Sequence, residues 1–106
     1  MSVKELNGSE FDSFVSENKV ALIDCWAPWC GPCRRMGPEV DKVAEELDGK
    51  VAVGKLNTDE NQDVGMRFGI SAIPTLLVFV DGTLRDSLVG LRPAEDIIEA
   101  MAAYLE

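Results

Sequence analysis

Residues 20–33 read VALIDCWAPWCGPC, and this segment guides the interpretation of the whole chain. Residues 20–26 form a β-rich apolar run with one carboxylate, Asp24, which is typical of a strand covered on both faces. From Cys30 onward, apolar residues follow helical spacing. They are Met36, Val40, Val43, Ala44 and Leu47. The segment therefore predicts a buried strand that leads into an amphipathic helix.

Two cysteines lie at the expected start of this helix. Unpaired backbone N–H groups and the helix dipole favour an anion there, so we expect a lowered pKa for the Cys30 thiol. Cys33 lies about one turn further along on the same side, where its sulfur can reach that of Cys30. Pro32 suits the first helical turn, and Gly31 leaves room for the sulfur of a partner. The pattern favours redox chemistry.

A static disulfide and half of a metal site are the alternatives for this cysteine pair. Zinc would need two more ligands, but the chain has no histidine and offers only Cys25 besides carboxylates. Strand alternation places Cys25 on the opposite face of the sheet from Asp24, so we expect no metal here. The lack of histidine also excludes Ser-His-Asp and Cys-His hydrolases.

Other elements are predicted on both sides of the segment. Ser9 as N-cap and the apolar spacing behind it predict a helix at 9–17, and Pro38 predicts a kink in the long helix. The remaining predictions are a strand at 51–56, a helix at 60–68, strands at 76–80 and 83–89 joined by Asp81-Gly82, and a last helix from Pro93. This order implies a mixed sheet with helices on both faces.

The composition restricts the possible partners and location. A chain of 106 residues can bury one core but not two. Its net charge of −9 repels phosphate backbones, so we expect no nucleic-acid partner. No apolar run approaches the roughly 20 residues that cross a bilayer, and no secretory signal is visible. Three cysteines with one close pair indicate a reducing compartment, so we expect a cytoplasmic protein. We also expect it to be a monomer.

Two motifs of the chain resemble those of thioredoxins. Residues 24–33, DCWAPWCGPC, resemble the active-site segment, and Ile73-Pro74-Thr75 resembles the family's substrate-facing cis-proline loop. The Asp81-Gly82 hairpin and Gly90 also fall where that family has them. The resemblance covers nearly the whole chain and implies one thioredoxin domain over residues 1–106. That α/β fold has a central mixed sheet of about five strands with a C-terminal antiparallel hairpin, flanked by about four helices.

The resemblance assigns roles to the polar residues of the site. In thioredoxins the first cysteine, here Cys30, is the exposed nucleophile that attacks a disulfide in another protein, and the second, here Cys33, resolves the mixed disulfide. Asp24 fits as the proton acceptor for Cys33, because burial in an apolar strand raises the pKa of a carboxyl group. The alternative is a structural pairing of Asp24 with Lys55, since the family places a lysine on the neighbouring strand. The two interpretations are compatible.

Target binding is assigned to the surface around the cysteines. Trp29 would form part of a docking surface, and Ile73 and Pro74 would present backbone groups to an extended segment of the target. Gly90, like Gly31, would border this groove.

Two residues beside the site are given structural interpretations. Trp26 is expected to pack beneath the site, and direct contact with the target is the alternative. Cys25 stands where thioredoxins usually carry a bulky apolar residue. We expect it to be a small buried hydrophobe, with a regulatory thiol as the alternative.

The resemblance implies an enzyme, a dithiol carrier that reduces disulfide-containing target proteins and is itself reduced by a thioredoxin reductase. The chain has no nucleotide-binding glycine fingerprint, so we expect no bound cofactor and electron supply from another protein. One alternative is a structural protein-binding module with incidental thiols. Another is a disulfide-forming or isomerising variant, although Gly31-Pro32 resembles the dipeptide of the reducing members.

Overall fold

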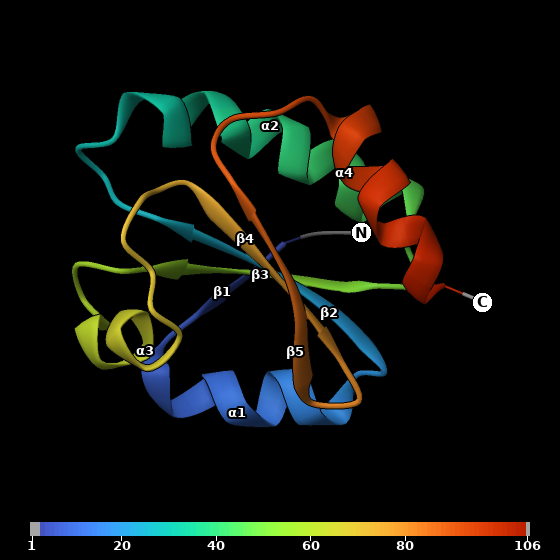
Figure 1. Cartoon of the computed structure of the whole chain (residues 1–106), viewed down its shortest axis with the longest axis horizontal. Helices are drawn as coiled ribbons and strands as arrows, with labels where there is room; N and C mark the ends of the chain where they lie inside the picture. The colour runs from blue at the N-terminus through green and yellow to red at the C-terminus, as the bar shows by residue number, and fades with distance from the viewer. Residues whose placement is uncertain (1–2, 106) are drawn as a thin grey trace.

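A five-stranded sheet forms the centre of the computed structural model, which describes residues 3–105 (Figure 1). The strands are β1 (Lys4–Leu6), β2 (Val20–Trp26), β3 (Ala52–Asn57), β4 (Thr75–Val80) and β5 (Thr83–Val89). Their order in the sheet is β1-β3-β2-β4-β5. β3 pairs in parallel with β1 and β2, whereas β4 pairs antiparallel with β2 and β5. The mixed sheet with a C-terminal hairpin confirms the predicted fold class.

Helices cover both faces of this sheet, as predicted (Figure 1). They are α1 (Gly8–Glu17), α2 (Gly31–Glu46), α3 (Gln62–Arg67) and α4 (Ala94–Met101), and a 3₁₀ turn follows at Ala102–Tyr104. α2 and α4 bury their apolar stripes against one face, and α1 and α3 pack on the other. Pro38 lies inside α2, which continues beyond it. Among residues 3–105, no helix has the length and apolar character needed to cross a membrane.

The start of the chain differs from the prediction. β1 was not predicted as a strand, because it is short and buries only Leu6. Ser9 is not the N-cap of α1. The N-cap is Asn7, because its Oδ1 accepts the N–H of Glu10 at 3.0 Å. In return, the Glu10 carboxylate accepts the N–H of Asn7 at 3.1 Å. This reciprocal capping box satisfies two helix-end donors. Ser9 instead donates its hydroxyl to Asn7 Oδ1.

β2 occupies the middle of the sheet and determines which face each site residue joins. Asp24 is in register with Lys55 of β3 and Leu76 of β4. Cys25 packs in the core under α1 and α3, whereas Leu22 packs under α2 and α4. Because side chains alternate along a strand, Asp24 faces α2, as Leu22 does. The predicted separation of Asp24 and Cys25 onto opposite faces is confirmed.

The turn between β4 and β5 is the predicted two-residue hairpin. Asp81 and Gly82 have φ values of 52° and 80°. Two consecutive positive φ values match the twist of the flanking strands, and glycine adopts them without steric cost. The turn sets the pairing of Val80 with Thr83 and of Phe79 with Leu84, and the register then shifts between Phe79 and Val78.

Candidate active site

The two cysteines lie at the N-terminus of α2 and form a disulfide bond, with their Cα atoms 5.2 Å apart. Cys30 is the N-cap residue, and its Sγ accepts the backbone N–H of Cys33 at 3.2 Å. Pro32 lies in the first helical turn, as expected. In the reduced protein, a backbone N–H and the helix N-terminus at this position stabilise a Cys30 thiolate.

The exposure of the two cysteines differs from the expectation. Cys30 is only 4% exposed, and Cys33 is 5% exposed. Both pack in a small cluster with Ala27, against which Trp26 and Ile73 also pack. These neighbours cover both sulfurs in the disulfide state. Cys30 is therefore not the exposed partner of the pair here, and exposure does not distinguish the two roles.

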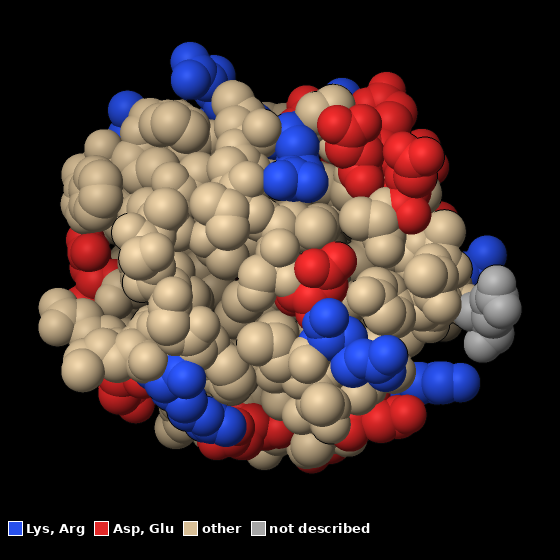
Figure 2. Space-filling view, viewed as in Figure 1, with Lys and Arg blue, Asp and Glu red and all other residues tan. Residues whose placement is uncertain are grey.

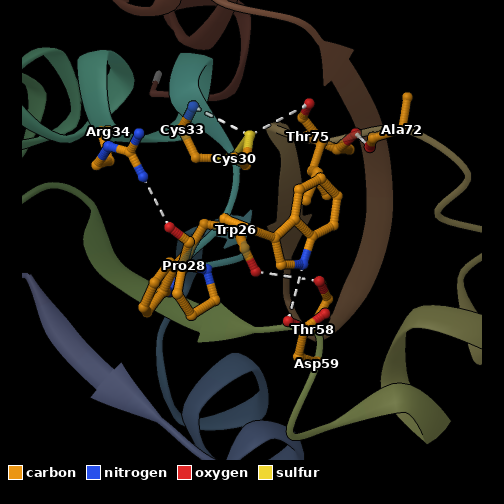
Figure 3. The surroundings of a disulfide bond; sticks show 11 residues. Trp26, Pro28, Cys30, Cys33, Arg34, Thr58, Asp59, Ala72 and Thr75 are labelled. Atoms are coloured by element: carbon orange, nitrogen blue, oxygen red, sulfur yellow. Dashed lines mark hydrogen bonds between the residues drawn. A yellow bond between two sulfur atoms is a disulfide. The ribbon is translucent and has the colours of Figure 1, made fainter.

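The predicted cis-proline loop lies next to the disulfide. The Ile73-Pro74 peptide bond is cis, and the carbonyl oxygen of Ile73 lies 3.8 Å from Cys30 Sγ. Gly90 donates its N–H to the Pro74 carbonyl at 2.8 Å. Its φ of 98° favours glycine. The fold thus brings Ile73, Pro74 and Gly90 together at the disulfide, and Figure 3 shows the segment from Ala72 to Thr75 on this side of Cys30.

A first hollow, the Trp29 hollow, opens on this side of the disulfide and measures about 320 Å³. Its lining residues are Trp29, Thr58, Gln62, Gly65, Met66, Ile70, Ser71, Ala72 and Ile73. Trp29 and Met66 are exposed by 68% and 82%, which is unusual for large apolar side chains. Figure 2 shows that the surface over α3 and the loop before β4 is mostly uncharged, whereas acidic side chains gather over α4.

Two hydrogen bonds and one apolar side chain around the site were not predicted from the sequence. The Trp29 indole N–H donates to Asp59 Oδ2 at 2.9 Å, so the loop after β3 orients the exposed ring. Arg34 donates to the carbonyl oxygen of Pro28 at 2.8 Å and braces the loop before the cysteines (Figure 3). Met66 adds an apolar surface from α3. Asp59 and Met66 carry no local signal, because only the fold brings them near Trp29, which is 30 or more positions away.

Asp24 lies on the other side of the disulfide, within the sheet. Its side chain is only 3% exposed, and burial raises the pKa of the carboxyl group from 3.8 to about 6. The Lys55 ammonium opposes this rise, and Asp41 adds to it. The carboxyl group is therefore mostly ionised at pH 7, yet close enough to neutrality to exchange a proton.

A second hollow, the Asp24 hollow, joins this carboxyl group to the second cysteine. It measures about 370 Å³ and is lined by Asp24, Trp26, Cys33, Arg34, Gly37 and Lys55. Asp24 and Lys55 form no direct ion pair among residues 3–105, and the Lys55 ammonium lies 5.7 Å from the centroid of the Trp26 ring. Lys55 thus acts on Asp24 through its charge. Trp26 is partly buried and packs against the cluster that contains the disulfide.

Cys25 is fully buried and forms no disulfide. Burial, with a smaller contribution from Asp24, raises the pKa of its thiol to about 12. A thiol of this kind does not ionise at neutral pH and is unreactive. The structure therefore favours the small buried hydrophobe over the regulatory thiol. Within the described range 3–105, no group of three or more His, Cys, Asp or Glu residues is placed to hold a metal ion.

Comparison with known proteins agrees with this geometry. The thioredoxin family model matches residues 2–103. The chain is 39% identical to a thioredoxin of Pyropia yezoensis, covering 99% of both chains. It is 39% identical to a thioredoxin of Staphylococcus epidermidis, covering 99% of this chain and all of the relative. A mutant thioredoxin from Halobacterium salinarum superimposes with a TM-score of 0.93 at 36% identity, covering 99% of this chain and 92% of the other.

Some relatives are longer than this chain. An M-type chloroplastic thioredoxin of Spinacia oleracea is 40% identical over 97% of this chain, which spans only 58% of that relative.

Proposed function

Because this chain belongs to the thioredoxin family, whose members are disulfide oxidoreductases, we propose that it reduces disulfide bonds in target proteins and is re-reduced by a partner reductase. The observation that carries this proposal is the Cys30–Cys33 disulfide at the N-terminus of α2, directly beside the cis-proline loop. We propose that the chain acts as a monomer with neither metal nor bound cofactor, in the cytoplasm.

In the first step, the Cys30 thiolate attacks one sulfur of the target disulfide. A new sulfur–sulfur bond joins Cys30 to the target, and the other target sulfur leaves as a thiolate and takes a proton from solvent. The N–H of Cys33, 3.2 Å from Cys30 Sγ, supports the anionic form of the nucleophile. Cys30 is the better nucleophile because it is the N-cap residue, whereas Cys33 lies inside the helix.

In the second step, Cys33 resolves the mixed disulfide. Asp24 accepts the proton of the Cys33 thiol, and the resulting thiolate attacks Cys30 Sγ. The Cys30–Cys33 bond forms, the bond to the target breaks, and the target leaves with two electrons. The shared hollow of Asp24 and Cys33 and the raised pKa of the carboxyl group support this role.

Target binding is assigned to the side of the Trp29 hollow. Trp29 and Met66 offer exposed apolar surface there, and Ile73, Pro74 and Gly90 border the disulfide. An extended target segment that lies along residues 73–74 would place its disulfide near Cys30.

The test is a trapping experiment with a disulfide-containing protein such as insulin. Wild-type protein accelerates the reduction of insulin by dithiothreitol, whereas Cys30→Ser gives no acceleration. Cys33→Ser, reduced beforehand and freed of dithiothreitol, accumulates a mixed disulfide through Cys30. Cys25→Ala is the matched control and retains activity, because this thiol lies outside the site. A stable mixed disulfide formed by the Cys30→Ser variant instead would reverse the two roles.

The alternative functions give different results. A structural binding module would keep its biological activity in a Cys30→Ser, Cys33→Ser double variant. A disulfide-forming or isomerising protein would show an equilibrium potential well above the value of about −270 mV that is typical of reducing thioredoxins. Size measurement in solution tests the monomer, and cell fractionation tests the location.

A further inference from the structure

We propose that Gly37 keeps open a solvent passage through which Asp24 exchanges its proton with bulk water while a target protein covers the other side of the disulfide. The inference rests on the proposed role of Asp24 as proton acceptor and goes one step further, because it says how the accepted proton leaves.

The Asp24 hollow and the Trp29 hollow share no lining residue. Cys33 lines the Asp24 hollow, and Ile73, whose carbonyl lies beside Cys30, lines the Trp29 hollow. Docking over Trp29 and Ile73 therefore does not require the target to cover any residue that lines the Asp24 hollow. The proton that Asp24 takes from Cys33 has a route to solvent that does not cross the interface with the target.

The residues that line the Asp24 hollow are buried at its bottom and exposed at its rim. Asp24 and Cys33 are buried, whereas Arg34 is exposed and Gly37 and Lys55 are partly exposed. The Arg34 guanidinium group donates to the carbonyl oxygen of Pro28. This contact directs the guanidinium toward the loop before the cysteines. Gly37 and Lys55 therefore form the part of the rim that controls access to the carboxyl group.

Unpaired polar atoms indicate that this hollow holds solvent. Asp24 Oδ1 and Trp26 Nε1 are buried and have no hydrogen-bond partner within the part of the chain that the structure describes. Both residues line the hollow. Buried polar atoms are almost always hydrogen-bonded, and a hollow of about 370 Å³ beside these two atoms has room for water that would satisfy them.

The position of Gly37 on α2 explains its effect. Cys33, Gly37 and Asp41 are spaced four residues apart and so follow one another along one face of the helix. A Cβ atom at Gly37 would meet no atom within 4 Å, so a side chain there has open space before it. Helical side chains lean toward the preceding turn, so a large residue would extend toward Cys33 and over Asp24.

The charged and titratable groups around Asp24 come from all the elements at the hollow. Cys33, Arg34 and Asp41 belong to α2, Lys55 belongs to β3, and Cys25 is the neighbour within β2. Leu76, its register partner on β4, is apolar. Filling the hollow at Gly37 changes none of these charges and removes only solvent. We therefore expect any effect of a large side chain at Gly37 to come from the loss of water around the Asp24 carboxyl group.

The experiment compares Gly37→Leu with Gly37→Ala, which also replaces the glycine but leaves most of the hollow open. In the oxidised protein, carbon NMR of the Asp24 carboxyl group gives its titration midpoint. We expect Gly37→Leu to raise this midpoint by about one pH unit or more, since loss of water disfavours the carboxylate, and Gly37→Ala to change it less. Gly37→Met replaces the leucine variant if that variant does not fold.

The kinetic readout separates the two chemical steps. At pH 7, we expect Gly37→Leu to slow release of the target from the mixed disulfide about tenfold and to shift the pH profile of this step upward. In the Cys33→Ser background, the rate of mixed-disulfide formation should not change. The slowing should also vanish in the Asp24→Asn background. Equal Asp24 midpoints and equal release rates in Gly37→Leu and Gly37→Ala would overturn the proposal.

Two outcomes distinguish this inference from the proposed function. If Asp24→Asn slows target release but Gly37→Leu does not, the proposed solvent passage at Gly37 is refuted, whereas the role of Asp24 as proton acceptor stands. If Asp24→Asn releases the target at the wild-type rate throughout the pH range, the role of Asp24 and the passage both fail. In a Cys33→Ser mixed disulfide, Asp24 should still titrate with the target attached, and a carboxyl group that no longer titrates would overturn the passage.

Discussion

The buried carboxyl group of Asp24 should make the protein less stable as the pH rises, and Asp24→Asn should remove this loss. The folded protein holds the Asp24 proton up to a pKa of about 6, whereas an unfolded chain releases it near 3.9. Between these values the folded state binds more protons than the unfolded state. The free energy of unfolding therefore falls as pH rises through this window and stays lower above it. Asparagine does not ionise, so the variant avoids this decrease.

The size of the effect follows from the shift. A rise of about two pKa units corresponds to about 3 kcal/mol, at about 1.4 kcal/mol per unit. At pH 4, Asp24 is largely neutral in the folded protein, and the two proteins differ only by the exchange of a carboxylic acid for an amide. By pH 7 to 8, the variant should have gained about 3 kcal/mol relative to wild type.

Urea unfolding of the oxidised proteins at several pH values measures this difference. In the oxidised state Cys30 and Cys33 do not titrate, and the pKa of Cys25 is about 12, so the thiols do not contribute in this range. Asp48→Asn, at an exposed position, removes the same charge and serves as the control. A difference between Asp24→Asn and wild type that stays constant from pH 4 to 8, or that shrinks as pH rises, would refute the argument.

Three further predictions follow from the site. Lys55→Gln should raise the titration midpoint of Asp24 in carbon NMR, because the ammonium charge that stabilises the carboxylate is lost; an unchanged midpoint would contradict the electrostatic role. Iodoacetamide at pH 8 should leave Cys25 unmodified in the reduced native protein and label it in urea, and rapid native labelling in a mass spectrum would contradict its burial. Gly90→Ala should cost about 1 kcal/mol or more in urea unfolding because of its positive φ, whereas Gly31→Ala, with open space and no positive φ, should cost less, and equal losses would contradict this reasoning.

Local sequence patterns predicted the parts of the fold that local physics controls. The cysteine pair follows a buried strand and opens a helix, so its position at a helix N-terminus could be inferred from neighbouring residues. The Asp81-Gly82 turn was predicted correctly for the same reason, because its φ values depend on the two residues themselves. The helical spacing of apolar residues in α2 and the continuous apolar run of β2 were each long enough to identify the element.

Features that depend on distant residues were not predicted. β1 has one buried residue, Leu6, which is too short a pattern to identify as a strand, and its pairing with β3 is what stabilises it. The contact between Trp29 and Asp59 joins two loops, and no local rule connects them. The burial of Cys30 arises from packing by Trp26 and Ile73, which only the folded chain brings together.

The central place of β2 has a consequence for how the protein opens. β2 is bonded along both of its sides, to β3 and to β4, whereas β1 and β5 form the two margins of the sheet. Amide protons of β2 should exchange with deuterium only through global unfolding, while those of β1 exchange through fraying. Opening at the margins therefore leaves intact the strand that leads into the cysteines, so the strand-to-helix junction that carries Cys30 persists until global unfolding.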